Sequence, residues 1–119
     1  MIGIDIVVIS RIEKLIEKFG DKALDRFLDE DEKKLIKSPS TVAGFWAAKE
    51  AASKAIGTGI GSSCGFYDIK ISKDNNNAPK IKYKKEIIKK FKIKNSSLSI
   101  THDGGFAIAV VALEKKWLL

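Results

Sequence analysis

The residues best suited to chemistry are two acids and two lysines. Asp5 lies in an apolar run near the start of the chain, whereas Lys49, Glu50 and Lys54 lie in an alanine-rich segment. Proteins commonly hold Mg²⁺ with one or two carboxylates, together with oxygens of a substrate phosphate. We therefore predict that Asp5 and Glu50 share a divalent cation, and that Lys49 and Lys54 hold phosphate beside it.

Asp5 is notable because its neighbours should form a buried strand. The segment 2–9 is apolar on both faces except for this one carboxylate. A buried carboxylate needs a cation as its partner, because an unpaired charge is costly to remove from water. The simpler interpretation is an acid at a strand end, or one paired with a lysine. The sequence has no Cys and His spacing typical of zinc, so we do not expect a structural metal site.

Glu50 and Lys54 are four residues apart and therefore share one face of a helix predicted at 41–56. The simpler interpretation is an exposed ion pair, which contributes only about 0.3–0.5 kcal/mol. However, the flanking positions are alanines, and Gly44 is present although glycine costs about 1 kcal/mol inside a helix. Gly44 therefore indicates close packing against another element.

Three other features are weaker candidates. The glycine-rich stretch 57–61 follows a helix, whereas a phosphate cradle lies at a helix start. We interpret Gly57 as a helix cap that continues into a flap against which a ligand could lie. His102 precedes Asp103, and a histidine in this setting is more often a hydrogen-bonded turn residue than a catalyst. Cys64 has no basic neighbour, so we expect it to be inert.

A mixture of strands and helices must position these residues. Apolar alternation and turn residues predict strands at 2–9, 66–73, 80–84, 98–102 and 106–113. Periodicity and capping residues predict helices at 11–19, 21–28, 33–37, 41–56 and 86–91. Capping boxes are expected at Ser10 with Glu13 and at Asp29 with Glu32. The turn at 103–105 should join the last two strands as a hairpin.

The final predicted strand is apolar on both faces. One face carries Phe106, Ile108 and Val110, and the other carries Ala107, Ala109 and Val111. An antiparallel sheet in a small domain usually leaves one face in water. Because few helices are available to cover a second face, we expect a neighbouring subunit to cover it.

Composition limits the class of protein. The 119 residues should form a single domain that buries roughly two-thirds of the surface exposed by the unfolded chain. The single cysteine excludes an internal disulfide and fits a reducing compartment. We find neither a signal peptide nor a membrane-spanning segment. We therefore expect a cytoplasmic protein.

The formal charge of +7 comes mainly from lysine, since Arg11 and Arg26 are the only arginines among 22 basic residues. The stretch 80–94 holds eight lysines and one acid. Such a field could attract nucleic acid, an anionic membrane, an acidic protein or a polyphosphate, or it could be a solvated face. Few arginines argue against base readout. A lysine-rich nucleic-acid-binding domain is the alternative function, and a purely structural trimer is a weaker one.

Three motifs, taken in order, resemble the holo-[acyl-carrier-protein] synthases, a family of 4′-phosphopantetheinyl transferases. They are Gly3-Ile4-Asp5-Ile6 with Arg11-Ile12, the segment 43–61, and Leu98-Ser99-Ile100-Thr101-His102. The resemblance covers essentially the whole chain, and the Lys-Glu-Ala…Lys-Ala-x-Gly signature is highly specific. It implies transfer of the 4′-phosphopantetheine arm of coenzyme A to a serine of apo-acyl carrier protein, which releases adenosine 3′,5′-bisphosphate in fatty acid biosynthesis.

The resemblance also implies roles for individual residues. Asp5 and Glu50 would be the Mg²⁺ ligands, and Lys49 and Lys54 would face the phosphates of coenzyme A. Glu50, or a water that it orients, would accept the serine proton. Lys54 would stabilise the departing oxygens.

The remaining implied roles concern partners. Gly57 would border coenzyme A, His102 would lie near its nucleotide end, and Arg11 would meet an acidic residue of the carrier protein. The implied fold is α+β, a small antiparallel sheet packed with helices. It would form a homotrimer with active sites at subunit boundaries, and neither nucleic acid nor membrane would be a partner.

Two positions depart from the family pattern. Phe45 stands where the family usually has an arginine, which removes one expected phosphate contact. Asn77-Ala78-Pro79 stands where the family has Gly-x-Pro in an Asp-x-x-Gly-x-Pro turn, and we expect this change to affect only the turn conformation.

Overall fold

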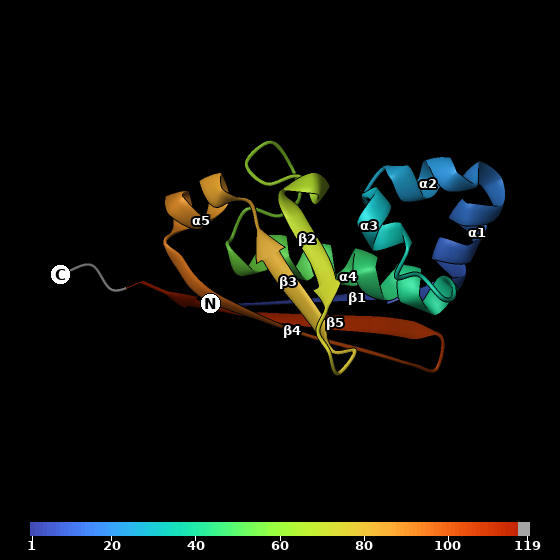
Figure 1. Cartoon of the computed structure of the whole chain (residues 1–119). Helices are drawn as coiled ribbons and strands as arrows, with labels where there is room; N and C mark the ends of the chain where they lie inside the picture. The colour runs from blue at the N-terminus through green and yellow to red at the C-terminus, as the bar shows by residue number, and fades with distance from the viewer. Residues whose placement is uncertain (117–119) are drawn as a thin grey trace.

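A computed structural model of the chain describes residues 1–116, which form an α+β fold of helices and two antiparallel sheets (Figure 1). The elements in order are β1 (Ile2–Val8), α1 (Ile9–Phe19), α2 (Asp21–Asp25), α3 (Glu30–Lys33), α4 (Pro39–Ala55), the 3-10 turn η1 (Phe66–Asp68), β2 (Ile69–Lys73), β3 (Pro79–Tyr83), α5 (Lys85–Phe91), β4 (Ile93–Asp103) and β5 (Phe106–Lys115). Within this part of the chain, no helix has the length and apolar character needed to cross a membrane.

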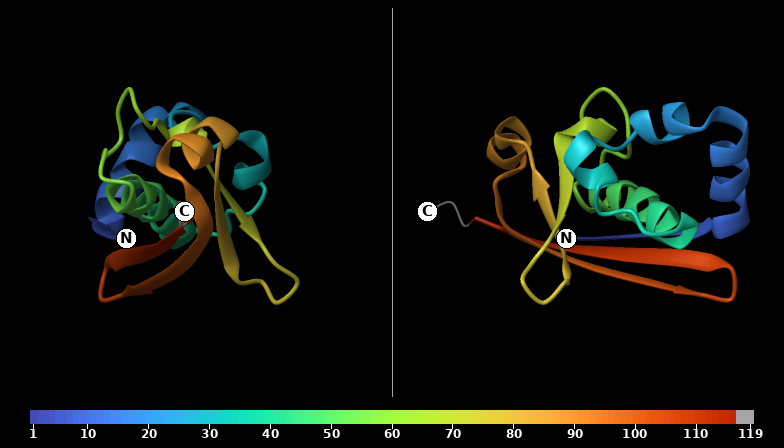
Figure 2. Two further views of the ribbon diagram at one scale, coloured as in Figure 1. Left: turned by 90° about the vertical axis from the view of Figure 1, so that its left-hand side faces the viewer. Right: turned by 45° about the vertical axis from the view of Figure 1, so that its right-hand side comes forward.

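The larger sheet has the strand order β1-β5-β4, and β2 pairs with β3 in a separate two-stranded sheet. The strands β4 and β5 form a long hairpin that extends beneath the helices (Figures 1 and 2). Its turn is made by Gly104 and Gly105, whose φ values of 57° and 86° suit glycine. The expected hairpin at 103–105 is therefore confirmed.

Helix α4 lies against the three-stranded sheet and is buried along most of its length (Figure 1). Close approach is possible because glycines lie at two contacts. A Cβ atom on Gly3 would lie 2.0 Å from the carbonyl oxygen of Ala51, and one on Gly44 would lie 2.9 Å from Cγ2 of Ile100. The close packing predicted at Gly44 is confirmed.

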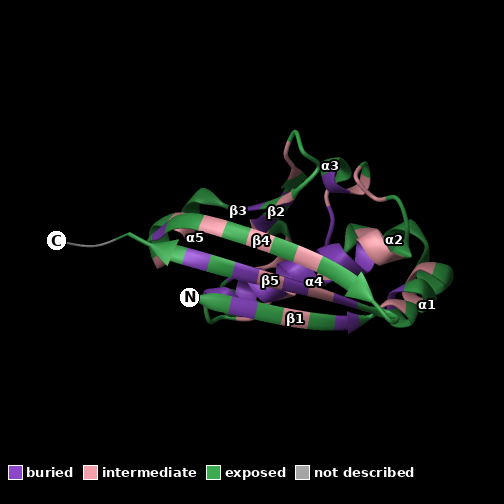
Figure 3. Cartoon of the chain, turned by 90° about the horizontal axis from the view of Figure 1, so that it is seen from below, coloured by how far each residue is buried: buried purple, intermediate pink, exposed green. Residues whose placement is uncertain are grey.

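The two faces of the three-stranded sheet differ sharply in burial. Ala107, Ala109 and Val111 are buried on the face that carries α4. On the opposite face, the side chains of β1 are exposed, with Ile2 at 71% and Ile4 at 60%. Figure 3 shows this alternation from below, with exposed and half-buried stretches on β1 and β5. We call the open surface formed by Ile2, Ile4, Ile6, Val8, Phe106, Ile108 and Val110 the apolar sheet face.

Several element boundaries differ from those expected. The Ser10–Glu13 capping box is wrong: α1 begins at Ile9, its N-cap is Val8, and no side chain caps it. The strand passes directly into the helix because Ile9 N–H donates to the carbonyl of Gly105, 2.9 Å away. The Asp29–Glu32 capping box is confirmed, although α3 starts earlier than expected, at Glu30.

Candidate functional site

Asp5 and Lys54 meet where β1 crosses the end of α4. Lys54 Nζ lies 2.8 Å from Asp5 Oδ1 and donates a second hydrogen bond to the carbonyl of Ile4 at 3.2 Å. The side chain of Asp5 is 15% exposed and that of Lys54 is 49% exposed. The close crossing at Gly3 brings the strand near enough to the helix for this pair to form.

Glu50 lies one helical turn before Lys54 and is half-buried. Burial raises the pKa of Glu50, and the negative charge of Asp5 raises it further, while Lys54 and Arg11 oppose the shift. The two acids are therefore close enough to repel each other. A cation beside the two carboxylates would relieve this repulsion, and their role as Mg²⁺ ligands stays a prediction.

The donor set restricts which metal would fit. Within residues 1–116, no group of three or more His, Cys, Asp and Glu side chains is arranged to hold a metal ion. Asp5 and Glu50 offer carboxylate oxygens only, which suit a hard cation such as Mg²⁺ that keeps waters or substrate oxygens in its other positions. The pair fits Mg²⁺ better than zinc, which prefers a closed set of nitrogen and sulfur ligands.

Lys49 lies elsewhere, although it precedes Glu50 directly. Its side chain is fully buried, and its Nζ contacts Glu32 Oε1 at 2.9 Å. It also donates to the carbonyls of Phe27 at 2.6 Å and Phe66 at 3.1 Å. Burial lowers the pKa of Lys49, and Glu32 opposes this shift. The prediction that Lys49 holds phosphate beside Asp5 and Glu50 disagrees with this placement, because three acceptors already occupy its ammonium group.

Glu32 is the residue that sequence reasoning missed. We expected it only as the second member of a capping box, and it does accept from Asp29 N–H at 2.9 Å. Its carboxylate is also the buried counterion of Lys49 and accepts from Ile71 N–H at 2.8 Å. The capping pattern signalled an ordered carboxylate at this position but did not identify the lysine.

Gly57 and His102 lie at different edges of the fold. Gly57 follows α4 with a φ of 86°, and its N–H donates to the carbonyl of Lys54, so the predicted helix cap is confirmed. His102 is exposed near the end of β4 and pairs with Ala107. It lines a cavity of about 600 Å³ beside the start of α1, together with Ser10 and Glu13. His102 is therefore a strand residue and not a turn residue.

Arg11 lies at the border of an apolar groove. The groove has a volume of about 460 Å³ and is formed mainly by α1, α2 and α4. Its apolar lining includes Ile12, Leu15, Ile16, Phe19, Phe27 and Trp46. Its basic lining consists of Arg11, Lys22 and Arg26. An amphipathic acidic partner would match both properties.

The two departures from the family pattern have clear structural settings. Phe45 is 1% exposed and packs in the core, so this position offers no charge to a ligand. Asn77 has a φ of 62°, a conformation that glycine or asparagine adopts most readily. The Asp74 carboxylate holds this turn by accepting from the N–H groups of Asn76 and Ala78. The structure thus confirms that the change at Asn77 concerns the turn.

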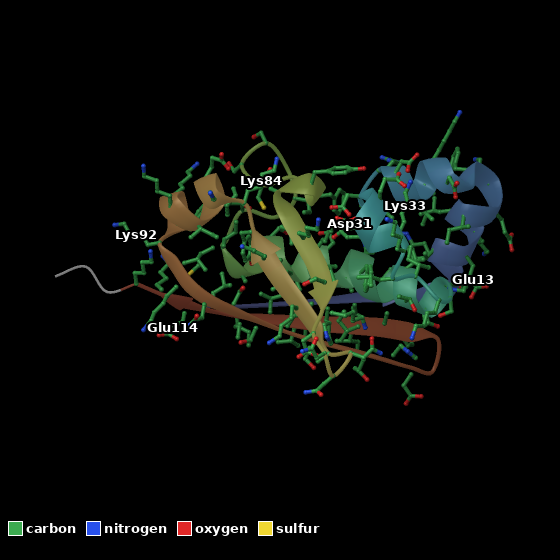
Figure 4. The ribbon with its side chains drawn as sticks, in the orientation of Figure 1. Glu13, Asp31, Lys33, Lys84, Lys92 and Glu114 are labelled. Atoms are coloured by element: carbon green, nitrogen blue, oxygen red, sulfur yellow. The ribbon has the colours of Figure 1, made fainter. Side chains whose placement is uncertain are left out.

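Other ion pairs lie on the surface. Lys84 pairs with Asp68 at 3.2 Å, and Lys94 pairs with Glu114 at 3.2 Å. Figure 4 shows Lys92 and Glu114 at one end of the molecule and Glu13 at the other. The eight lysines of the stretch 80–94 are all exposed. Exposed pairs of this kind contribute little to stability, so the Asp5 site and the Lys49–Glu32 pair are the charged groups of greatest interest.

Comparisons with known proteins identify the family of this chain. The 4′-phosphopantetheinyl transferase superfamily profile matches residues 1–111. A holo-[acyl-carrier-protein] synthase of Aliarcobacter butzleri is 70% identical over 118 residues, which is 98% of this chain and 100% of the relative. The Helicobacter pylori synthase, solved in complex with coenzyme A, is 53% identical with a TM-score of 0.93, and the match covers 96% of this chain and 100% of that one.

A less similar solved structure belongs to the same family of synthases. The synthase of Bacillus anthracis in complex with CoA (3′,5′-ADP) is 39% identical, with a TM-score of 0.81, and the match covers 97% of this chain and 96% of that one. The fold and the matched sequence define a transferase. The chain belongs to the 4′-phosphopantetheinyl transferase superfamily, and within it to the holo-[acyl-carrier-protein] synthases.

Proposed function

We propose that this enzyme transfers 4′-phosphopantetheine from coenzyme A to a serine of apo-acyl carrier protein in the cytoplasm, as a step in fatty acid biosynthesis. Adenosine 3′,5′-bisphosphate leaves, and the reaction depends on Mg²⁺. The observation that carries the proposal is the meeting of Asp5, Glu50 and Lys54 at one crossing of strand and helix. The family membership and the coenzyme A complex of the Helicobacter pylori relative support the choice of substrate.

Mg²⁺, when bound by Asp5 and Glu50, would neutralise charge that develops on the pyrophosphate oxygens. The protein groups complete the site around it. Lys54 is half-exposed, so its ammonium group is accessible to substrate oxygens and can stabilise the leaving group. The pKa of Glu50 is raised in the metal-free protein, but a bound cation would favour its ionised form and weaken it as a base. Glu50, or a water that it orients, would accept the serine proton.

We include a homotrimer in this proposal because the apolar sheet face is exposed to water in the single chain, and a neighbouring subunit would bury it. Ile2, Ile4 and Ile6 expose 71%, 60% and 57% of their surface in the single chain. A continuous apolar surface of this kind usually marks a protein interface. A neighbouring subunit on this face would place its residues next to β1, close to Asp5. Gly57 and His102 would border coenzyme A at such a boundary.

The carrier protein would bind at Arg11 and the groove beside it. Carrier proteins of this class are acidic, and the enzyme carries a formal charge of +7, so attraction should raise the encounter rate at low salt. An amphipathic acidic helix would place its apolar side chains in the groove and its acids near Arg11 and Arg26.

An intact-mass assay tests the transfer reaction. Apo-carrier protein incubated with the enzyme, coenzyme A and Mg²⁺ should gain the mass of one phosphopantetheine, and a chelator should abolish the gain. An unchanged carrier mass would overturn the proposal. The lysine-rich nucleic-acid-binding alternative predicts instead a steep salt dependence of duplex binding and full tolerance of Asp5→Asn.

A further inference from the structure

The buried pair of Lys49 and Glu32 has no role in the proposed transfer, yet Lys49 directly precedes Glu50 in the sequence. Lys49 is 0% exposed and Glu32 is 1% exposed. Burying two charges is costly, and an apolar pair of the same size would often be at least as stable. The pair therefore calls for an explanation other than stability alone.

The contacts of the pair fix one geometry. Lys49 reaches three acceptors, on Glu32, Phe27 and Phe66. The Glu32 carboxylate accepts from Lys49, Asp29 N–H and Ile71 N–H, and no buried side-chain polar atom in residues 1–116 lacks a partner. A fully satisfied network of this kind has few alternative arrangements of similar energy. It therefore joins α4 to α3, to the middle of β2 and to the η1 segment.

Other contacts also hold α4 in place, since Phe45 is buried, Trp46 packs against the rings of Phe27 and Phe66, and Lys54 pairs with Asp5. The buried surface of the helix is largely alanine, including Ala47, Ala48, Ala51 and Ala52. These small side chains let neighbouring elements approach the helix closely, and Lys49 is buried and charged among them. Besides Lys49, a second polar contact on this side is the Tyr83 hydroxyl, which donates to the carbonyl of Ala52 at 2.7 Å.

Successive residues of a helix point about 100° apart, so fixing one side chain sets the direction of the next. We propose that the Lys49–Glu32 pair is a positioning device that sets the rotation of α4 and so directs the Glu50 carboxylate toward Asp5. This inference rests on the proposed function, in which Glu50 and Asp5 act together. Lys49 and Glu32 are positioning residues, since neither contacts Asp5, Glu50 or Lys54.

The test compares the enzyme with the double variant Lys49→Met/Glu32→Leu, which removes both charges while keeping apolar volume. A second double variant, Lys49→Gln/Glu32→Gln, keeps hydrogen-bonding groups without charge. Lys70→Met is the matched control. It removes a lysine that also joins β2 to the α3 segment, but whose ion pairs with Asp29 and Asp31 are exposed. Circular dichroism and thermal melting identify which variants are folded.

Mn²⁺ binding measured by electron paramagnetic resonance, and kcat and KM measured separately, are the readouts. In a folded double variant we expect Mn²⁺ affinity and kcat to fall about tenfold or more, as is common when a positioning partner of a metal ligand is lost. The KM for carrier protein and all properties of Lys70→Met should stay unchanged. A folded double variant with unchanged Mn²⁺ affinity overturns the inference. Loss of folding in both double variants, or absence of Mn²⁺ binding by the unmodified enzyme, also overturns it.

The Mn²⁺ measurement separates this inference from the proposed function. If the unmodified enzyme binds Mn²⁺ but transfers no phosphopantetheine, the proposed function fails while the positioning role is still decided by the variants. If the enzyme transfers phosphopantetheine and the double variants bind Mn²⁺ normally, only the positioning role fails.

Discussion

Lys54 Nζ and Asp5 Oδ1 lie 2.8 Å apart, although 49 positions separate the two residues in the chain. This contact joins the end of α4 to β1 and places one positive and one negative charge at the crossing. Because Glu50 lies one turn before Lys54, the same crossing gathers both acids that we assign to the metal. The site therefore depends on how closely the strand and the helix approach each other.

Neutralising either acid should lower activity strongly without unfolding the enzyme. We expect Asp5→Asn and Glu50→Gln to lower kcat/KM by about 100-fold or more, because each removes a carboxylate from the metal site. Glu50→Gln should keep the free energy of unfolding, since it also removes the repulsion with Asp5. Steady-state kinetics and urea unfolding check both expectations. Asp31→Asn, which alters an exposed acid paired with Lys70, is the control and should keep full activity.

The pH dependence of stability should carry the signature of Glu50. Its pKa in the folded, metal-free enzyme is raised above the usual value of 4.5. Between the unfolded and the folded pKa, the Glu50 carboxyl is therefore protonated in the folded state and ionised in the unfolded chain. The stability contributed by Glu50 is fully present below the unfolded pKa and is lost as the pH rises through the folded pKa. Metal binding has the opposite trend and strengthens with pH, because a cation needs the ionised carboxylate.

Urea unfolding of the metal-free wild type and Glu50→Gln, measured over roughly pH 4 to 7, isolates this effect. The stability of the wild type relative to the variant should decrease as the pH rises. A relative stability that increases with pH would contradict the raised pKa of Glu50.

Gly3 is the position where a single added carbon should damage the fold most. A Cβ there would lie 2.0 Å from the oxygen of Ala51 and 2.6 Å from the nitrogen of Ala55, both backbone atoms. We expect Gly3→Ala to destabilise by about 1–3 kcal/mol or more, because β1 must move away from α4. Gly61→Ala is the matched control, since nothing lies within 4 Å of a Cβ there, and its effect should stay within about 1 kcal/mol. Urea unfolding measures both changes.

A charge on the apolar sheet face should disrupt assembly. Ile4→Lys should convert the proposed trimer to a monomer, as seen by light scattering after size-exclusion chromatography, because a lysine would be buried at the interface. The isolated fold should tolerate the change, since Ile4 is 60% exposed in the single chain. Phe19→Lys alters an apolar residue of similar exposure at the end of α1, outside this face, and should leave the oligomeric state unchanged. A monomeric wild type would contradict the proposed assembly.

Arg11 should matter for the carrier protein more than for coenzyme A. We expect Arg11→Glu to raise the KM for carrier protein by about tenfold, because it places an acid where an acidic partner would bind. The KM for coenzyme A should change much less. Lys90→Glu gives the same change in net charge on α5, at the other end of the molecule, and should have a small effect (Figure 1). Raising the ionic strength should likewise affect the carrier KM more, and equal effects on both KM values would argue against steering.

Local signals predicted the elements that hold the site. Ser38 caps α4 and Pro39 begins it, two residues before the predicted start at 41. Gly57 ends the same helix with a positive φ. These signals act within a few residues, so α4 and the spacing of Glu50 and Lys54 on it could be predicted well. The lone carboxylate in the apolar segment 2–9 indicated Asp5 as the second acid, and the family resemblance implied the same role.

The features that could not be predicted depend on contacts between distant segments. Two adjacent residues of α4, Lys49 and Glu50, point to different neighbours, and only the packed fold decides which neighbour each meets. The partner of Lys49 is Glu32, 17 positions away, in a helix whose local pattern explained it as a cap. The start of α1 was misplaced for a similar reason, because its first N–H pairs with Gly105.

The order of strands in the larger sheet has a consequence for how the newly made protein folds. The central strand β5 is synthesised after the other four strands, and β1 lies beside β5 alone in that sheet. During translation, about a hundred residues must therefore leave the ribosome after β1 before β5 can pair with it. Until then β1 has no strand partner in that sheet, and Val7, which is buried in the folded chain, lacks its neighbour Ala107. Both pairings of the three-stranded sheet, β1 with β5 and β4 with β5, therefore depend on the strand that is synthesised last.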